Sequence, residues 1–281
     1  MTGSVLVDVN DSPASGRAVE WAAARAADLG APLRLVHVMH ESVRQSGDTR
    51  VADAAESSAD ALLERAAATV AQIAPSAEVT SVIEYGDPLK VFVRLSEDAE
   101  LIVVGSDTST DERPSRRGTR GFRIAAASKT AVAVIPDLDL TGRRGVVVGA
   151  DGSEPSQNAL AFAIAEADRL GEPLIAVNAW TNPVVYGYDV TFPVEYLDDL
   201  DEAGQRTLDH ALEGITSAYP NVDVQRVVVE GDPVIALADA AGTASLLVIG
   251  SHGRGAVARL LLGSVSHGLL AHLVAPTVVV R

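Results

Sequence analysis

The sequence predicts an α/β protein that consists of two doubly wound five-stranded parallel sheets, one in each half of its 281 residues. Three features predict this fold: an internal repeat, short apolar runs rich in Val, Leu and Ile, and Ala-rich segments between those runs. Strands that are covered on both faces read as continuous apolar runs. Strands that alternate with helices favour right-handed crossovers in a parallel sheet.

The two halves of the chain repeat one pattern of residues. VLVDVNDSPASGRAVEWAAARAADLGAPLRLVHV, from Val5, aligns with VVVGADGSEPSQNALAFAIAEADRLGEPLIAVNA, from Val146. Further matches are GDP at 86–88 and 231–233, LIVVGS at 101–106 and LLVIGS at 246–251, and TAVAVIP at 130–136 and PTVVVR at 276–281. A repeat of this length indicates a duplicated domain. We expect domains at residues 1–140 and 141–281, divided in the polar stretch 137–144.

The second half carries the clearer series of predicted elements. Its predicted strands are 146–150, 174–179, 222–229, 245–250 and 277–280. The segment 156–170 has helical spacing and stops at Gly171, a residue type that commonly follows a helix. Pro233 predicts the first turn of another helix. The last helix should begin at Gly263-Ser264.

Composition excludes several classes of function. The formal net charge of −16 argues against nucleic-acid binding, which needs basic surface, but local backbone dipoles can still hold a small anion. The chain has no cysteine, which excludes disulfides, thiolate catalysis and Cys-based zinc sites. No signal-peptide pattern is visible, and no apolar run approaches the ~20 residues of a membrane span. We expect a soluble cytoplasmic protein without a membrane span.

Glycines and a carboxylate follow two predicted strands of the second half. In open parallel sheets, ligands bind beyond the carboxyl ends of the strands. Asp151 comes directly after the first strand, and GSHGRGAVARLLLGS, at 250–264, follows the fourth. Glycine lets backbone N–H groups approach a ligand, and a helix N-terminus at Gly263-Ser264 favours phosphate. Asp151 suits a ribose hydroxyl or a metal ion beside the phosphates.

These residues alone leave two interpretations open. Either they form a nucleotide site, or the glycines make a tight turn and Asp151 caps a helix. The chain has no GxxxxGK[ST] loop, and the first strand of the second half ends in GADGS rather than in the GxGxxG fingerprint. No histidine pair has the HExxH spacing, and Ser251 is not in a GxSxG motif. We therefore propose no catalytic residue from the sequence.

The combination of motifs resembles the universal stress protein family. The residues that carry the resemblance are Gly250-x-x-Gly253 followed by nine residues and Gly263-Ser264, VGADGS at 148–153, the GDP turns and the terminal VVVR. The resemblance covers essentially the whole chain twice, as in tandem members. It implies Rossmann-like sheets of the adenine nucleotide alpha hydrolase type, with strand order 3-2-1-4-5. It also implies an internal pseudo-dimer in which 131–135 pairs antiparallel with 277–281.

The same resemblance implies that the second half binds ATP, with Mg²⁺ as its companion ion. The implied site residues are Ala150 and Asp151, the backbone near Ala179 beside adenine, Gly250 and Gly253 at the ribose and phosphates, Gly263, Ser264, Val265 and Ser266 on the phosphate chain, and Arg254 as an added cation. The implied role is nucleotide-responsive regulation or stress tolerance, with a homodimer and an unidentified protein as further partners. A slow ATPase or nucleotide-transforming enzyme, and an interaction scaffold without nucleotide, remain the alternatives.

The first half departs from this pattern. Asn10 stands where Asp151 stands, and Thr108 replaces Gly253. Asp107 adds negative charge at the same place, while five arginines, Arg113, Arg116, Arg117, Arg120 and Arg123, crowd the following stretch. Arginine clusters can recognise phosphate, but a solvated basic loop is the commoner role of such a stretch. We expect a weak, altered or lost site in this half.

Overall fold

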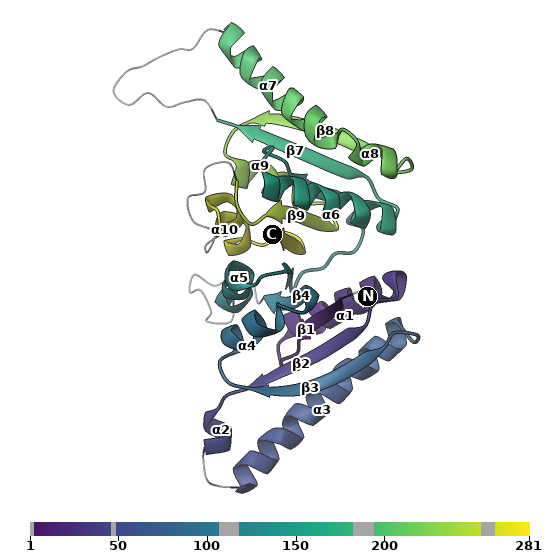
Figure 1. The fold of residues 1–281 in the computed structure, drawn as a ribbon, viewed down its shortest axis with the longest axis vertical. Coiled ribbons are helices and arrows are strands. Elements are labelled where there is room, and N and C mark those ends of the chain that lie inside the picture. The colour runs from purple at the N-terminus through teal and green to yellow at the C-terminus, as the bar shows by residue number, and fades with distance from the viewer. Residues whose placement is uncertain (1–2, 46–48, 107–117, 182–193, 254–261) are drawn as a thin grey trace, which may run out of the picture. The chain divides into compact units, whose positions relative to one another are not determined.

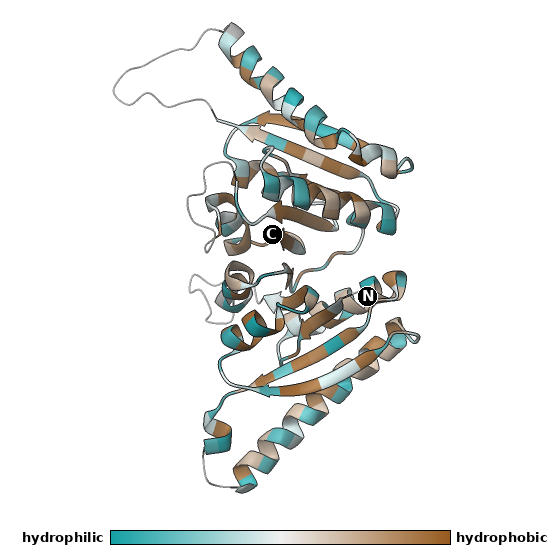
Figure 2. Cartoon of the chain, in the orientation of Figure 1, coloured by the Kyte–Doolittle hydropathy of each residue, from teal (hydrophilic) through white to brown (hydrophobic). Residues whose placement is uncertain are grey.

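The computed structural model describes residues 3–45, 49–106, 118–181, 194–253 and 262–281. The chain divides into two compact units, Met1–Leu138 and Asp139–Arg281, which we call unit 1 and unit 2. In each unit, helices cover both faces of a sheet (Figure 1). The strands are mostly apolar along their length, as expected for strands buried on both faces (Figure 2).

Unit 1 contains five strands and five helices among its described residues. They are β1 (Ser4–Asp8), α1 (Pro13–Leu29), β2 (Leu33–Met39), α2 (Ser42–Gln45), α3 (Thr49–Ile73), β3 (Val79–Tyr85), α4 (Pro88–Leu95), β4 (Ala99–Ser106), α5 (Gly118–Ala127) and β5 (Ala131–Pro136). All strand pairs within the unit are parallel, in the order β3-β2-β1-β4-β5.

Unit 2 repeats this series of elements. They are β6 (Val146–Gly149), α6 (Glu154–Leu170), β7 (Leu174–Trp180), α7 (Val194–Leu212), α8 (Ile215–Ala218), β8 (Val224–Glu230), α9 (Pro233–Ala241), β9 (Leu246–Gly250), α10 (Ser264–Ala271) and β10 (Thr277–Val280). The parallel order is β8-β7-β6-β9-β10. The predicted doubly wound sheets with order 3-2-1-4-5 are confirmed.

Matching strand registers align the two units residue by residue. Val5 of β1 pairs with Leu33, just as Val146 of β6 pairs with Leu174. Ile102 of β4 pairs with Val132, as Leu247 of β9 pairs with Thr277. Position by position, Asp8 therefore corresponds to Gly149.

Two predicted boundaries in unit 2 were wrong by two residues. Helix α6 begins at Glu154 rather than at Ser156, because the Ser153 side chain caps it and Pro155 fits its first turn. Strand β8 begins at Val224 rather than at Val222, because the Val222 N–H donates to the Tyr219 carbonyl in a turn. Strand β10 spans Thr277–Val280, as predicted.

Glycines near the ends of β4 and β9 let helices approach the sheet closely. A Cβ on Gly105 would lie 2.5 Å from the backbone of Ala14 in α1, and a Cβ on Gly250 would lie 2.8 Å from the backbone of Pro155 in α6. Backbone atoms of a packed helix cannot move aside as a flexible side chain can. Gly250 is therefore required by helix packing, whatever else it does.

We predict opposite effects of two alanine substitutions in unit 1. Gly105→Ala should destabilise the unit by about 3 kcal/mol or more, because overpacking against rigid backbone strains the core. Gly16→Ala should stabilise it by roughly 0.5–1 kcal/mol, since Gly16 lies in the exposed face of α1 with open space at its Cβ. Urea unfolding followed by circular dichroism measures both. Equal effects of the two substitutions would contradict the packing argument.

Candidate functional site

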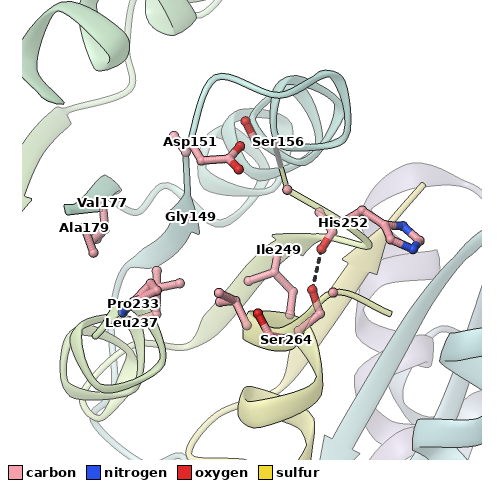
Figure 3. Close-up of a pocket in the computed structure, with 16 residues that line it drawn as sticks. Gly149, Asp151, Ser156, Val177, Ala179, Pro233, Leu237, Ile249, His252 and Ser264 are labelled. Atoms are coloured by element: carbon pink, nitrogen blue, oxygen red, sulfur yellow. Dashed lines mark hydrogen bonds between the residues drawn. The ribbon is translucent and has the colours of Figure 1, made fainter. Parts of the chain in front are cut away.

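A cavity of about 460 Å³ lies at the carboxyl edge of the unit 2 sheet, between the ends of β6, β7 and β9 and the first turns of α9 and α10 (Figure 3). This volume falls in the range of roughly 300–1,000 Å³ that is usual for small-molecule sites. Its lining residues are Gly149, Ala150, Asp151, Ser156, Val177, Ala179, Pro233, Leu237, Ile249, Gly250, His252, Gly253, Gly263, Ser264, Val265 and Ser266.

The first turn of α10 faces this cavity without a side-chain cap. Its N-cap residue is Gly263, which makes no side-chain cap hydrogen bond. By contrast, Ser153 accepts from the Ser156 N–H at the start of α6, and Asp232 accepts from the Val234 N–H at the start of α9. A helix N-terminus carries partial positive charge and N–H groups that need acceptors. The α10 terminus therefore offers donors to an anionic ligand in the cavity.

The backbone at Gly263 does not itself require glycine. Its φ of −63° is open to any residue. A Cβ there would make only ordinary contacts, the nearest at 3.4 Å from the His252 Cα. The fold of unit 2 would thus accept a side chain at Gly263. Because glycine has none, no side chain covers the start of α10 at this position.

Asp151 shapes the turn after β6 and borders the cavity. Its Oδ1 accepts hydrogen bonds from the Ser153 N–H at 3.0 Å and from the Ser153 hydroxyl at 2.6 Å. In unit 1 the Asn10 amide oxygen accepts from the Ser12 N–H at 3.1 Å in the same way. The turn therefore works with an amide, and Asp151 is not the cap of α6, as one interpretation of the sequence had it.

Gly253 leaves room for the Asp151 carboxylate. A Cβ on Gly253 would lie 2.5 Å from Asp151 Oδ2. Any side chain at position 253 would therefore clash with the Asp151 carboxylate at the cavity wall. The unit 1 equivalents are Asn10 and Thr108, and Thr108 lies outside the described residues.

Two buried polar side chains hold the strand ends in place. The Ser266 hydroxyl, from α10, donates to the Gly250 carbonyl at 2.7 Å. The Asn178 amide, from β7, donates to the Ala150 carbonyl at 2.7 Å. In unit 1 the His37 ring takes the place of Asn178 and lies 2.8 Å from the Val9 carbonyl. These contacts fix the backbone on which Asp151 and Gly253 sit.

His252 lines the cavity, but its ring turns away from Asp151 (Figure 3). Its Nδ1 lies 3.2 Å from the Ser251 hydroxyl. Burial, and secondarily the Arg281 cation, lower the pKa of His252 below its ordinary value. The lowered pKa favours the neutral imidazole over its cation.

The structure gathers nine of the ten residues proposed from the sequence around this one cavity. They are Ala150, Asp151, Ala179, Gly250, Gly253, Gly263, Ser264, Val265 and Ser266. Arg254, the tenth, lies outside the described residues. Ser266 is 3% exposed and its hydroxyl is directed to the Gly250 carbonyl. Its contact is thus with the chain itself.

Sequence reasoning missed the apolar side of the cavity. Val177 precedes Ala179 by two positions in β7, and strand periodicity places the two on one face. Pro233 and Leu237 come from α9, the helix that the GDP turn introduces. The repeated GDP was the available signal, because it placed a helix start at the same edge of each sheet.

No cluster of three or more His, Asp or Glu side chains among the described residues could hold a metal ion by itself. In the same residues, no helix combines the length and the apolarity that crossing a membrane would require.

A doubly wound sheet with a cavity at its carboxyl edge defines a class of small-molecule-binding α/β proteins. The sequence profile of the universal stress protein family matches residues 1–136 and again residues 142–281. This chain therefore belongs to the universal stress protein family, as a tandem member with two copies of the domain.

Known universal stress proteins align with this chain over nearly its whole length. Universal stress protein Rv2005c of Mycobacterium tuberculosis is 31% identical over 297 residues, which cover 99% of this chain and 96% of the relative. Universal stress protein Rv2623 of the same organism is 30% identical, with 99% and 96% covered. The crystal structure of a universal stress protein from Archaeoglobus fulgidus superposes with a TM-score of 0.71 at 20% identity, covering 99% of this chain and 98% of that one.

We predict that Asn178→Ala destabilises unit 2 by about 1–3 kcal/mol, because the buried Ala150 carbonyl loses its side-chain donor. Asn178→His should recover part of this loss, since His37 serves the same carbonyl position in unit 1. Chemical unfolding of the three proteins measures the effect. If alanine and histidine destabilise equally, the side chain acts by volume and not by hydrogen bonding.

Proposed function

We propose that unit 2 binds ATP together with Mg²⁺ and that the protein serves as a nucleotide-responsive regulator in stress tolerance. The observation that carries the proposal is the uncapped N-terminus of α10, with Gly263 as its N-cap, facing a cavity of about 460 Å³. Helix N-termini of this kind bind phosphate through backbone N–H groups and the helix dipole. The choice of an adenine nucleotide as the ligand follows from membership of the universal stress protein family.

The two sides of the cavity differ in chemistry as a nucleotide requires. The side near β7 and α9 is apolar, formed by Val177, Ala179, Pro233 and Leu237. An adenine ring buries well against such side chains. The other side presents Gly253 and the first turn of α10, where Ser264 supplies a hydroxyl and a backbone N–H, while the Gly263 N–H donates to the Ser251 carbonyl at 2.9 Å. The base and the phosphates therefore find suitable surfaces at opposite sides of one cavity (Figure 3).

Asp151 carries a carboxylate at the position where unit 1 has an amide. Asn10 makes the equivalent turn in unit 1 with an amide. The turn therefore does not need the charge of Asp151, and Gly253 leaves the space that the carboxylate occupies. Mg²⁺ is held in many nucleotide sites by one or two carboxylates together with the phosphates. When bound, the ion would reduce the negative charge of the phosphate chain beside Asp151.

A bound nucleotide would act on the protein through stability. A ligand that binds only the folded state stabilises it by about 2.7 kcal/mol at a hundredfold excess over its Kd. Unit 2 would therefore be more rigid at high ATP concentration than at low. A partner that reads the surface of unit 2 could respond to that difference, because a ligand shifts an equilibrium only through differential affinity.

We predict that Gly263→Asp abolishes ATP binding while leaving unit 2 folded and slightly more stable. The new carboxylate would cap α10 and complement its dipole, adding a few tenths to about 1 kcal/mol. It would also place a negative charge where the phosphates bind. Isothermal titration calorimetry and thermal unfolding measure the two effects together. Gly118→Asp, at the equivalent position in unit 1, serves as the matched control and should bind ATP as the wild type does.

Either of two results would contradict this proposal. Unchanged ATP affinity in Gly263→Asp would show that the α10 terminus does not hold the phosphates. A loss of binding that accompanies a large loss of stability would show that the substitution damages the fold instead.

We predict that Asp151→Asn weakens binding of Mg²⁺–ATP about tenfold or more, which corresponds to about 1.4 kcal/mol. Binding of ATP in the presence of a chelator should change much less, because the amide preserves the turn as Asn10 does. Titrations with and without Mg²⁺ measure the difference. Asp209→Asn removes the same charge on α7 and should have no effect. Equal weakening in both conditions would assign Asp151 to the ribose rather than to the ion.

A further inference from the structure

Unit 1 contains a buried ion pair at the carboxyl edge of its sheet. Asp8, the last residue of β1, is 0% exposed, and its Oδ1 accepts a hydrogen bond from Arg120 Nη2 at 2.8 Å. The Asn10 amide donates to the other carboxylate oxygen at 3.3 Å. Arg120 comes from the first turn of α5, which is 112 residues away in the chain. The pair thus ties the end of the central strand to the helix that follows β4.

The ion pair stands where unit 2 has its cavity. Asp8 corresponds to Gly149, and Arg120 corresponds to Val265, because they lie two positions beyond the equivalent glycines Gly118 and Gly263. Both Gly149 and Val265 line the cavity of unit 2. In unit 1 these two small or apolar positions carry a carboxylate and a guanidinium instead.

A third substitution adds to the filling. Leu237, on the apolar side of the unit 2 cavity, corresponds to Phe92 in unit 1, because each lies four residues beyond the proline of the GDP turn. Phe92 is 0% exposed and ranks among the largest fully buried side chains. We call the region of unit 1 that is equivalent to the unit 2 cavity the unit 1 crevice. Larger side chains therefore occupy this crevice from β1, α4 and α5.

The direction of the Asp8 side chain follows from the unit 2 backbone. A Cβ built on Gly149 would lie 3.1 Å from Leu237 Cδ1 and 3.9 Å from Ile249 Cγ2. Both of those residues line the cavity. A side chain at this position therefore points into the crevice.

The pair stabilises the crevice only while both partners are present. Burial raises the pKa of the Asp8 carboxyl, and the Arg120 cation and the Asn10 amide oppose that rise. A buried carboxylate that loses its partner keeps its desolvation penalty, which makes a broken pair much worse than an absent one. A carboxylate at this position also repels an incoming phosphate chain.

We infer that the Asp8–Arg120 ion pair and Phe92 occupy the unit 1 equivalent of the nucleotide cavity. Side chains of unit 1 thus fill the space that a nucleotide would need, and unit 1 folds without a ligand. Together with the proposed function, on which this part rests, the inference gives one nucleotide per chain. It also makes the chain asymmetric in its response, since ATP would stabilise unit 2 and leave unit 1 as it is.

Ligand counting and site-resolved stability test this inference together. Native mass spectrometry with Mg²⁺–ATP should give one nucleotide for the wild type, one for Gly118→Asp and none for Gly263→Asp. Hydrogen exchange read by mass spectrometry should show ATP-dependent protection at β6, β9 and α10 and none at β1, β4 and α5. Two nucleotides in the wild type, or one in Gly263→Asp, would overturn the inference.

A double-mutant cycle tests the ion pair without any nucleotide. Asp8→Asn should lower the thermal midpoint of unit 1 by on the order of 10 °C, because it leaves Arg120 unpaired. Asp8→Asn combined with Arg120→Met should recover at least half of that loss. Glu97→Gln breaks the exposed pair with Lys129 in the same unit and should shift the midpoint little. Additive effects of the Asp8 and Arg120 substitutions would overturn the inference.

The two experiments fail in different ways. If the wild type binds no ATP at millimolar concentration, the proposed function of unit 2 fails. The cycle on Asp8 and Arg120 then decides the inference alone, because the pair needs no ligand to act. If ATP binds once but the cycle is additive, the proposed function stands and the filling of unit 1 by the pair fails.

Discussion

Each helix that follows a parallel strand begins at the carboxyl edge of the sheet, where its first N–H groups need acceptors. The two units meet this need in several ways along one edge. Ser12 and Ser153 cap α1 and α6, and Asp87 and Asp232 cap α4 and α9. At α10 of unit 2 the N-cap is a glycine with no side-chain bond. Among the described helix starts at this edge, α1, α4, α6 and α9 are thus capped by side chains, whereas α10 at the wall of the cavity is not.

The same edge explains which glycines are structural and which are open to function. Gly250 has a counterpart in Gly105, and both are needed because a helix backbone lies within 3 Å of where a Cβ would be. Gly253 leaves space for the Asp151 carboxylate, and Gly263 meets no steric demand from the fold. The three glycines of the motif therefore differ: helix packing explains Gly250, the Asp151 carboxylate explains Gly253, and no steric demand of the protein explains Gly263.

The sequence predicted most of the fold but not the buried Asp8–Arg120 ion pair of unit 1. The repeat, the apolar runs and the proline and glycine signals predicted the strand order and placed α9 and α10 at their observed starts. Helix α6 begins two residues before the predicted Ser156, because Ser153 caps it and Pro155 fits its first turn. Arg120 was grouped with the neighbouring arginines as part of a basic loop, since nothing local distinguishes it. Its partner Asp8 sits inside an apolar run 112 residues away, and only the fold brings the two together.

Duplication makes the comparison of the units an internal control. Local geometry is shared, since Asn10 and Asp151 form the same turn and His37 and Asn178 reach the same carbonyl position. The two units differ at the carboxyl edge of the sheet, where glycine, leucine and valine in unit 2 correspond to aspartate, phenylalanine and arginine in unit 1. Because the surrounding fold is the same, the difference cannot come from folding requirements common to both copies. A copy whose side chains fill its own crevice can stay folded at any ligand concentration. The stability of the other copy can then vary with ligand concentration while the first copy stays folded.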